Sequence, residues 1–193
     1  MTANHSWAKR FEALGRTARG VRSIAALLVS ASVVISTPAA ALDLTKIAGI
    51  GGEGWTSKSA TAELVQLTCV APTCPPSGQL AIAARPAPDA ARDEVINDPQ
   101  GSLAGYRKGF EKSSVAQACT FENFRAEKVG DTGSRILMDG DCPSGLVVMM
   151  ATIFDRSQTG SISVVASSQD RAKADALRLQ TIGAIDGALG AAR

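Results

Sequence analysis

The chain has 193 residues, of which 20 are Lys or Arg and 18 are Asp or Glu, so its formal net charge is +2. Five of the basic residues and one acidic residue lie within residues 1–41, which leaves 152 residues with a net charge of −2. The single histidine, His5, also lies in this first segment. If the chain is processed after residue 41, it contains no histidine, which excludes histidine-based catalysis and histidine-ligated metals. Its net charge of −2 argues against nucleic-acid binding.

Residues 1–41 have the pattern of a cleavable signal peptide. Basic residues precede a twelve-residue, largely apolar run (24–35), and Pro38 and the small residues 39–41 follow it. A helix of twelve residues is about 18 Å long, which is too short for a hydrocarbon core of about 30 Å and disfavours an uncleaved anchor. We expect Sec-type export to the bacterial periplasm or the medium, with cleavage between Ala41 and Leu42 and no stable membrane insertion afterwards.

The expected mature chain begins with a glycine-rich segment, residues 42–60. Its run from Gly49 to Gly54 matches the G-x-G-x-x-G pattern of dinucleotide sites, but neither a preceding strand nor a following helical periodicity accompanies it. We therefore expect a flexible lead-in and no bound cofactor. Trp55 stands among small polar residues, so it is a candidate contact for a partner, the alternative being that it covers an edge of the core.

Residues 61–193 predict a single α+β domain. The apolar patterns indicate two strands and two helices, then four strands and a closing helix that is capped near Ser168 or Asp170. The expected ranges are strands 63–70 and 80–84, helices 89–97 and 102–116, strands 120–128, 135–139, 146–154 and 161–167, and a helix to about residue 189. Because hairpin connections dominate, we expect a largely antiparallel sheet flanked by helices.

The four cysteines all lie in the expected exported portion, where an oxidising compartment favours two disulfides. Cys119 and Cys142 flank a predicted hairpin and come to lie opposite each other when it folds about its middle. This leaves Cys69 and Cys74 to close a tight loop. A redox-active pair or a zinc site is the alternative, but neither the spacing nor the two prolines after Cys74 fit it.

The element order over about residues 79–189 resembles that of PsbP-like, Mog-type α/β/α domains. The resemblance lies in the order helix, two strands, central apolar strand, turn, strand and helix, and it assigns no functional residue. It implies a scaffold, assembly or accessory protein rather than an enzyme.

The most specific catalytic pattern is the run Asp131 to Ser134, which looks like the D-T-G-S turn of aspartic proteases. In those enzymes two aspartates share one proton, so the chemistry needs a second such turn from the chain or from a dimer partner. Asp-Thr-Gly also suits an ordinary hairpin turn, because Asp bonds locally and Gly permits a positive φ. We take the hairpin turn as the main interpretation and keep Asp131 as the catalytic candidate of the alternative.

Two further groups of residues carry atoms that can bind metal ions. Asp139 and Asp141 could offer oxygens to Ca²⁺ but lack the spacing of an EF-hand loop. Met138, Met149 and Met150 fall in predicted strands, where they suit core packing better than a copper site. We therefore expect no bound metal.

The sequence favours a non-enzymatic, exported binding or accessory module of the bacterial envelope that contacts an envelope protein or a small ligand. The first alternative is a periplasmic hydrolase of the aspartic-protease type that uses Asp131. The second alternative is a structural or stress-related envelope protein without a discrete ligand.

Overall fold

The computed structural model describes residues 41–191, except for the side chains of Ser114 and Ala191. The predicted signal peptide up to residue 40, with His5, lies outside the described residues. Across the part of the chain that is described, no helix is both long enough and apolar enough to span a membrane.

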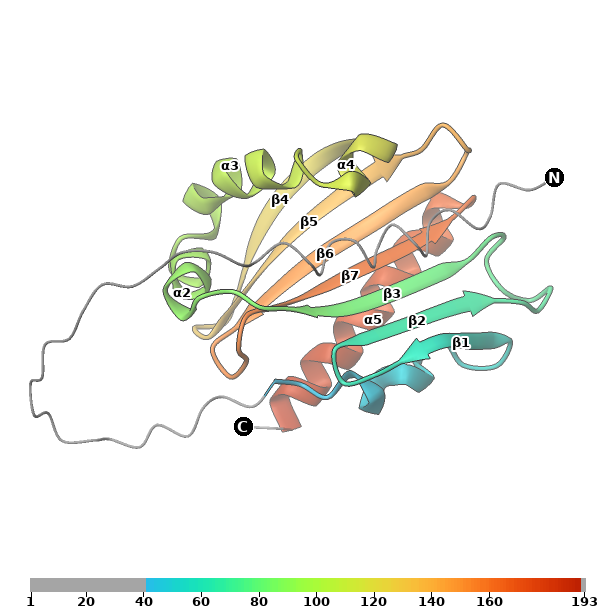
Figure 1. The fold of residues 1–193 in the computed structure, drawn as a ribbon, viewed down its shortest axis with the longest axis horizontal. Helices are drawn as coiled ribbons and strands as arrows, with labels where there is room; N and C mark the ends of the chain where they lie inside the picture. The colour runs from blue at the N-terminus through green and yellow to red at the C-terminus, as the bar shows by residue number, and fades with distance from the viewer. Residues whose placement is uncertain (1–40, 192–193) are drawn as a thin grey trace, which may run out of the picture. The chain divides into compact units, whose positions relative to one another are not determined.

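The domain is built on one sheet of seven strands, each antiparallel to its neighbours, in the order β1-β2-β3-β7-β6-β5-β4 (Figure 1). The strands are β1 (Trp55–Ala60), β2 (Leu64–Cys69), β3 (Gln79–Arg85), β4 (Thr120–Val129), β5 (Gly133–Asp141), β6 (Val147–Asp155) and β7 (Ser161–Ser168). The helices are the 3-10 helix η2 (Leu44–Gly51) and the α-helices α2 (Asp89–Asn97), α3 (Pro99–Phe110), α4 (Ser114–Ala118) and α5 (Arg171–Ala191). This confirms the expected α+β class and the antiparallel sheet.

The main core lies between one face of the sheet and the helices α5 and η2. Aligned residues from five neighbouring strands form one apolar row across this face: Leu137, Ala151, Val164, Ile82 and Val65. The predicted apolar side of α5 packs against the row, through Leu177, Ile182, Ile185 and Leu189. The helix therefore covers the centre of the sheet, because its apolar stripe matches the period-two alternation of the strands beneath it.

The opposite face of β4–β6 is covered by α2, α3 and α4 (Figure 1). Here the Tyr106 hydroxyl of α3 lies 2.6 Å from the Thr152 hydroxyl of β6. Thr152 alternates along β6 with Ala151 and Ile153, which face α5, so β6 is buried on both faces. This explains its nearly unbroken apolar sequence.

A bulge in β4 places two aromatic rings on the same face of the sheet. The register shifts between Glu122 and Arg125, and Asn123 has a φ of 53°. Phe121 and Phe124, three positions apart, would face opposite sides of a regular strand, but the extra residue brings both rings to Phe110 of α3 at 4.8 and 5.8 Å. The bulge thus serves to fasten α3 to the outer strand.

Ion pairs fasten α5 to β5 on the other face. Arg171 binds both carboxylate oxygens of Asp141, at 2.6 and 2.7 Å. Arg178, whose side chain is 2% exposed, donates to Asp139 at 3.0 Å and to Asp175 at 2.5 Å. The two aspartates weighed as calcium ligands are therefore both paired with arginines of α5.

Both predicted disulfides are confirmed. Cys119 directly precedes β4 and Cys142 directly follows β5, so the bond joins the open end of the β4–β5 hairpin, with the two Cα atoms 4.2 Å apart. Cys69 and Cys74 close the turn that follows β2, with their Cα atoms 5.8 Å apart. Each disulfide joins a cysteine to the next cysteine along the chain, so each restrains a local segment.

The structure differs from the expectation of a flexible lead-in over residues 42–60. Asp43 caps η2 by accepting a hydrogen bond from the Thr45 N–H at 3.0 Å, and Leu44 and Ile47 are buried in the main core. Residues 55–60 form β1, which the sequence analysis missed. Two apolar residues three positions apart were enough to anchor the segment, because they meet β2 and α5 in three dimensions.

The predicted helix 102–116 is two helices. It begins earlier, at Pro99, because Asp98 caps it by accepting from the Gly101 N–H at 2.9 Å and proline is well suited to a first turn. It ends at Phe110, and Ser113 then caps α4 by accepting from the Ala116 N–H at 3.2 Å. The cap at Ser113 restarts the helix after a turn, and periodicity alone did not distinguish this from one continuous helix.

We predict unequal contributions of the two disulfides to stability. Replacing Cys119 and Cys142 by Ala opens a loop of 24 residues and should lower the free energy of unfolding by about 3 kcal/mol. Replacing Cys69 and Cys74 opens a loop of six residues and should cost about 2 kcal/mol. Urea denaturation of the oxidised variants measures both losses, and a larger loss from the shorter loop would contradict the loop-entropy argument.

Candidate functional site

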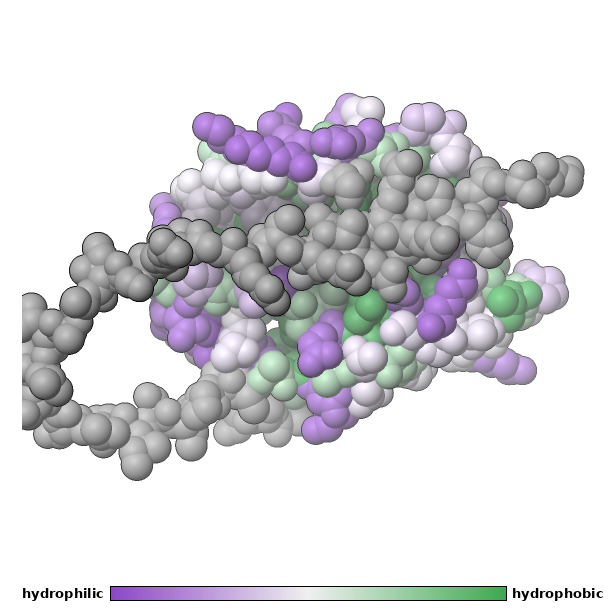
Figure 2. All heavy atoms as spheres, in the orientation of Figure 1, coloured by the Kyte–Doolittle hydropathy of each residue, from purple (hydrophilic) through white to green (hydrophobic). Residues whose placement is uncertain are grey.

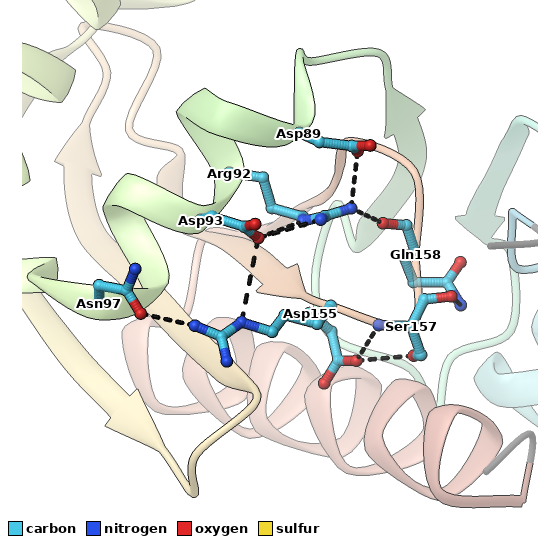
Figure 3. Close-up of polar contacts among 8 residues, drawn as sticks. Asp89, Arg92, Asp93, Asn97, Asp155, Ser157 and Gln158 are labelled. Atoms are coloured by element: carbon cyan, nitrogen blue, oxygen red, sulfur yellow. Dashed lines mark hydrogen bonds and ion pairs between the residues drawn. The ribbon is translucent and has the colours of Figure 1, made fainter. Parts of the chain in front are cut away.

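A cluster of polar side chains joins α2 to the turn between β6 and β7 (Figure 3). We call it the turn cluster. Its members are Asp89, Arg92, Asp93, Asn97, Asp155, Arg156, Ser157 and Gln158. It joins two segments about 60 residues apart in the sequence and contains a buried guanidinium, Arg92, and a buried amide, Gln158. Buried polar groups gathered in this way make the turn cluster the candidate site.

Arg92 is the centre of the cluster and is only 7% exposed. Its guanidinium donates to Asp89 at 2.8 Å, to Asp93 at 3.0 Å and to the backbone carbonyl of Gln158 at 2.6 Å. The spacing of Asp89 and Arg92 on α2 places them on the same face of the helix, one turn apart. Arg92 therefore ties the helix to the turn while its own charge is neutralised by carboxylates.

Arg156 makes a second, more exposed connection between the same elements. It donates to the Asn97 side-chain oxygen at 2.5 Å and lies 4.0 Å from the Asp93 carboxylate. Its backbone N–H donates to the Thr132 carbonyl at 2.9 Å, which also joins the turn to the β4–β5 hairpin. The turn is thus held from two sides.

The turn itself has local determinants. Asp155 accepts hydrogen bonds from the Ser157 backbone N–H at 2.9 Å and from its hydroxyl at 2.6 Å, as in an Asx-type turn. Gly160 has a φ of 83°, and a Cβ there would lie 2.1 Å from the Arg85 carbonyl oxygen. Only glycine fits at this position, because the turn closes tightly against the end of β3.

Gln158 links the turn to the beginning of the described chain. Its side-chain oxygen Oε1 accepts a hydrogen bond from the backbone N–H of Leu42, and its Nε2 donates to the Ser157 carbonyl at 3.2 Å. The residue is 5% exposed. A buried amide whose oxygen meets an N–H donor can bind an amide or an ammonium group.

The turn cluster is rich in oxygen acceptors, which the donors of the chain itself engage. Two arginines face three aspartates, and the aspartates and Gln158 present oxygen acceptors. Among residues 41–191, no group of three or more His, Cys, Asp or Glu side chains is placed to hold a metal ion.

Burial shifts two pKa values near the sheet. It lowers the pKa of the Arg85 guanidinium and raises the pKa of the Tyr106 phenol above its ordinary 10.0, an increase that the hydrogen bond with Thr152 partly offsets. Arg85 ends β3 beside the turn cluster, whereas Tyr106 belongs to the contact of α3 with the sheet.

Neither Asp131 nor Trp55 is a member of the turn cluster, but Thr132, the residue after Asp131, accepts the hydrogen bond from the backbone N–H of Arg156. Asp131 is exposed in the turn between β4 and β5. Trp55 is half-buried at the edge of the main core, and a Cβ on Gly51 would lie 2.4 Å from its ring. The glycines from Gly49 belong to η2 and the turn after it, so no strand leads into them.

The methionines weighed as copper ligands are all buried. Met138, Met149 and Met150 are between 0 and 6% exposed, and the alternation of β6 points Met149 and Met150 to opposite faces of the sheet. They fill the core on both sides of β6.

Sequence reasoning missed the turn cluster for a clear reason. The i, i+3 spacing of Asp89 and Arg92 is visible in the sequence, but it normally indicates only a surface ion pair on a helix. Nothing in the sequence relates Leu42 to Gln158, which lie 116 positions apart.

No protein-family model matches the chain, and no curated protein matches it.

We predict that the turn cluster supports stability mainly through Arg92. Replacing Arg92 with Ala should lower the free energy of unfolding by about 3 kcal/mol, because it leaves buried acceptors without their charged donor. The control is Arg125→Ala, which removes a half-exposed pair with Glu127 and should cost at most about 1 kcal/mol. Equal losses in urea denaturation would show that Arg92 is not a central connection.

We also predict a late titration of Tyr106, the only tyrosine of the chain. Tyrosinate absorbance should show a midpoint above pH 10.0, and Thr152→Val should raise it further by removing the bond that lowers the pKa. The unfolded chain releases this proton first, so stability is unaffected below pH 10 and falls as pH rises from there towards the folded pKa. Thr120→Val, an exposed change on β4, serves as the control, and a midpoint at the ordinary value would contradict the burial.

Proposed function

We propose that the protein is an exported, non-enzymatic accessory module of the bacterial envelope that contacts an envelope protein through the loop between β2 and β3. Export follows from the expected signal peptide, with cleavage between Ala41 and Leu42. The two disulfides support it, because such bonds persist in oxidising compartments. The resemblance of the element order to PsbP-like domains favours the same class of function.

The observation that carries the proposal is the exposed apolar tip of this loop. Val70 is 68% exposed, and among the described residues only Leu179 is a second exposed large hydrophobic side chain. Figure 2 shows the hydrophobic spot at the end of the sheet where β2 turns back towards β3. A partner that covers this side chain would remove its apolar surface from water, which favours binding.

The loop that carries Val70 is fixed in place. The Cys69–Cys74 disulfide closes it, and the Cys74 N–H donates to the Ala71 carbonyl at 3.1 Å. Further along, the Pro76 carbonyl accepts from the Ser168 hydroxyl at 3.0 Å and from the Gln169 N–H at 3.1 Å. A loop that is already ordered loses little conformational entropy when it binds, which favours recognition by a partner.

The surroundings of the loop also suit a protein interface. Residues 64–84, which form β2, the loop and most of β3, contain no charged side chain. The centres of protein interfaces are depleted in charge because charged groups are costly to desolvate. By contrast, Figure 2 shows hydrophilic side chains gathered over α3.

We predict that Val70→Asp strongly weakens binding of the partner. The tagged protein, exported by intact cells and crosslinked mildly, should recover one partner in stoichiometric amount, and the variant should reduce this recovery at least about tenfold. The matched control is Leu179→Asp on α5, which changes the other exposed apolar side chain and should leave recovery unchanged.

Two outcomes would contradict the proposal. Equal recovery with both variants would place the contact elsewhere on the domain. A lone monomer in every preparation would remove the accessory role, and an acid-favoured, pepstatin-sensitive proteolysis that Asp131→Asn abolishes would establish the hydrolase alternative in its place.

A further inference from the structure

We propose that the turn cluster is a receptor for the chain's own new N-terminus, which cleavage between Ala41 and Leu42 creates. The ligand is a primary ammonium group, and Gln158 Oε1 is the acceptor that binds it. This inference rests on the export and cleavage included in the proposed function. It assigns the buried Gln158 a role in recognising the processed form of the chain.

The chain changes from exposed to packed against the domain at the peptide bond between Ala41 and Leu42. Ala41 is exposed, Leu42 is half-buried against the main core, and Leu44 is completely buried. Asp43 between them caps η2 through two bonds to Thr45, at 3.0 and 2.7 Å. A peptidase can therefore reach the Ala41 side of the bond, while the chain from Leu42 onward is held by the fold.

Gln158 is oriented before any ammonium arrives. Its Nε2 donates to the Ser157 carbonyl, which sets the direction of the amide and leaves Oε1 as the acceptor facing Leu42. Its backbone N–H donates to the Asp155 carbonyl at 3.0 Å, and its own carbonyl accepts from Arg92. Three of the residue's four polar groups thus bind partners other than Leu42, and these three bonds orient the side chain independently of the ligand.

Hydrolysis changes what the Leu42 nitrogen can offer. Water is the co-reactant: the bond between the Ala41 carbonyl carbon and the Leu42 nitrogen breaks, the water oxygen becomes part of the Ala41 carboxylate, and both water protons join the nitrogen. A neutral amide with one N–H thus becomes an ammonium with three. Hydrogen bonds from a charged donor are roughly twice as strong as neutral ones, so cleavage strengthens the contact with Gln158.

The charges of the turn cluster do not oppose this cation. Arg92 is paired with Asp89 and Asp93, and Arg156 also lies within reach of Asp93. Asp155 adds a third carboxylate on the same turn as Gln158. The cluster therefore holds one more acidic than basic side chain, which favours a positive group at the turn.

The test is a comparison of two chains that differ by one residue at the N-terminus. One begins at Leu42 and the other at Ala41, and both are released from a fusion without added residues. In the second chain the charge is kept but the ammonium is moved one residue away, so the Leu42 nitrogen is still an amide. Gln158→Ala is made in both chains, with Gln117→Ala, an exposed change on α4, as the matched control.

We expect Gln158→Ala to lower the folding equilibrium constant about tenfold more in the chain that begins at Leu42 than in the chain that begins at Ala41. Gln117→Ala should change both chains equally and slightly. The same loss from Gln158→Ala in both chains would overturn the receptor, because Gln158 would then support only the amide contact.

A separate measurement tests the proposed export and cleavage position. Mass determination of the protein recovered from the exported fraction shows where processing occurs. A mature chain that begins elsewhere, together with a tenfold difference in the comparison, would reject the cleavage position while leaving a turn able to bind an ammonium group. A chain that begins at Leu42, with no such difference, would reject the receptor alone.

Discussion

The burial of β6 on both faces is the constraint on which the rest of the structure depends. All of its residues except the first, Val147, are buried. A strand of this kind needs a cover on each side, and the chain provides α5 on one side and α2 and α3 on the other. The three-layer arrangement therefore follows from one apolar run in the middle of the sheet.

Each cover is fastened by a buried arginine that meets backbone as well as carboxylates. Arg178 connects α5 to Asp139 of β5 and reaches the Met150 carbonyl at 3.4 Å. Arg92 connects α2 to the carbonyl of Gln158 after β6. Apolar packing alone would let a helix slide along the sheet, whereas an arginine that must satisfy fixed acceptors selects one position.

The sequence was sufficient for elements whose signal is local. The run that forms β6 and the alternation of β7 follow directly from apolar periods, and the bounds of α2 follow from Pro88 and Pro99, which flank it. The disulfides were predictable because each closes within one supersecondary unit. In these regions the residue pattern and the tertiary surroundings favour the same conformation.

Other parts could not be predicted because their stability comes from contacts distant in sequence. The segment before β2 is rich in glycine and small residues, and only its packing against α5 and β2 explains why Leu44 is buried. The bulge at Asn123 is visible only when the opposite strand fixes the register. The candidate site depends on Leu42 and Gln158, whose contact no short pattern encodes.

The pairing of the cysteines has a consequence for the way in which the chain acquires its bonds. Cys69 pairs with the next cysteine along the chain, and Cys119 pairs with the one after it. When a polypeptide emerges from a membrane pore with its N-terminus first, a catalyst that oxidises cysteines in order of appearance makes the native pairs directly. Non-consecutive pairing would require an isomerase to correct the first bonds. The connectivity of this protein therefore suits vectorial oxidation by a simple dithiol oxidase.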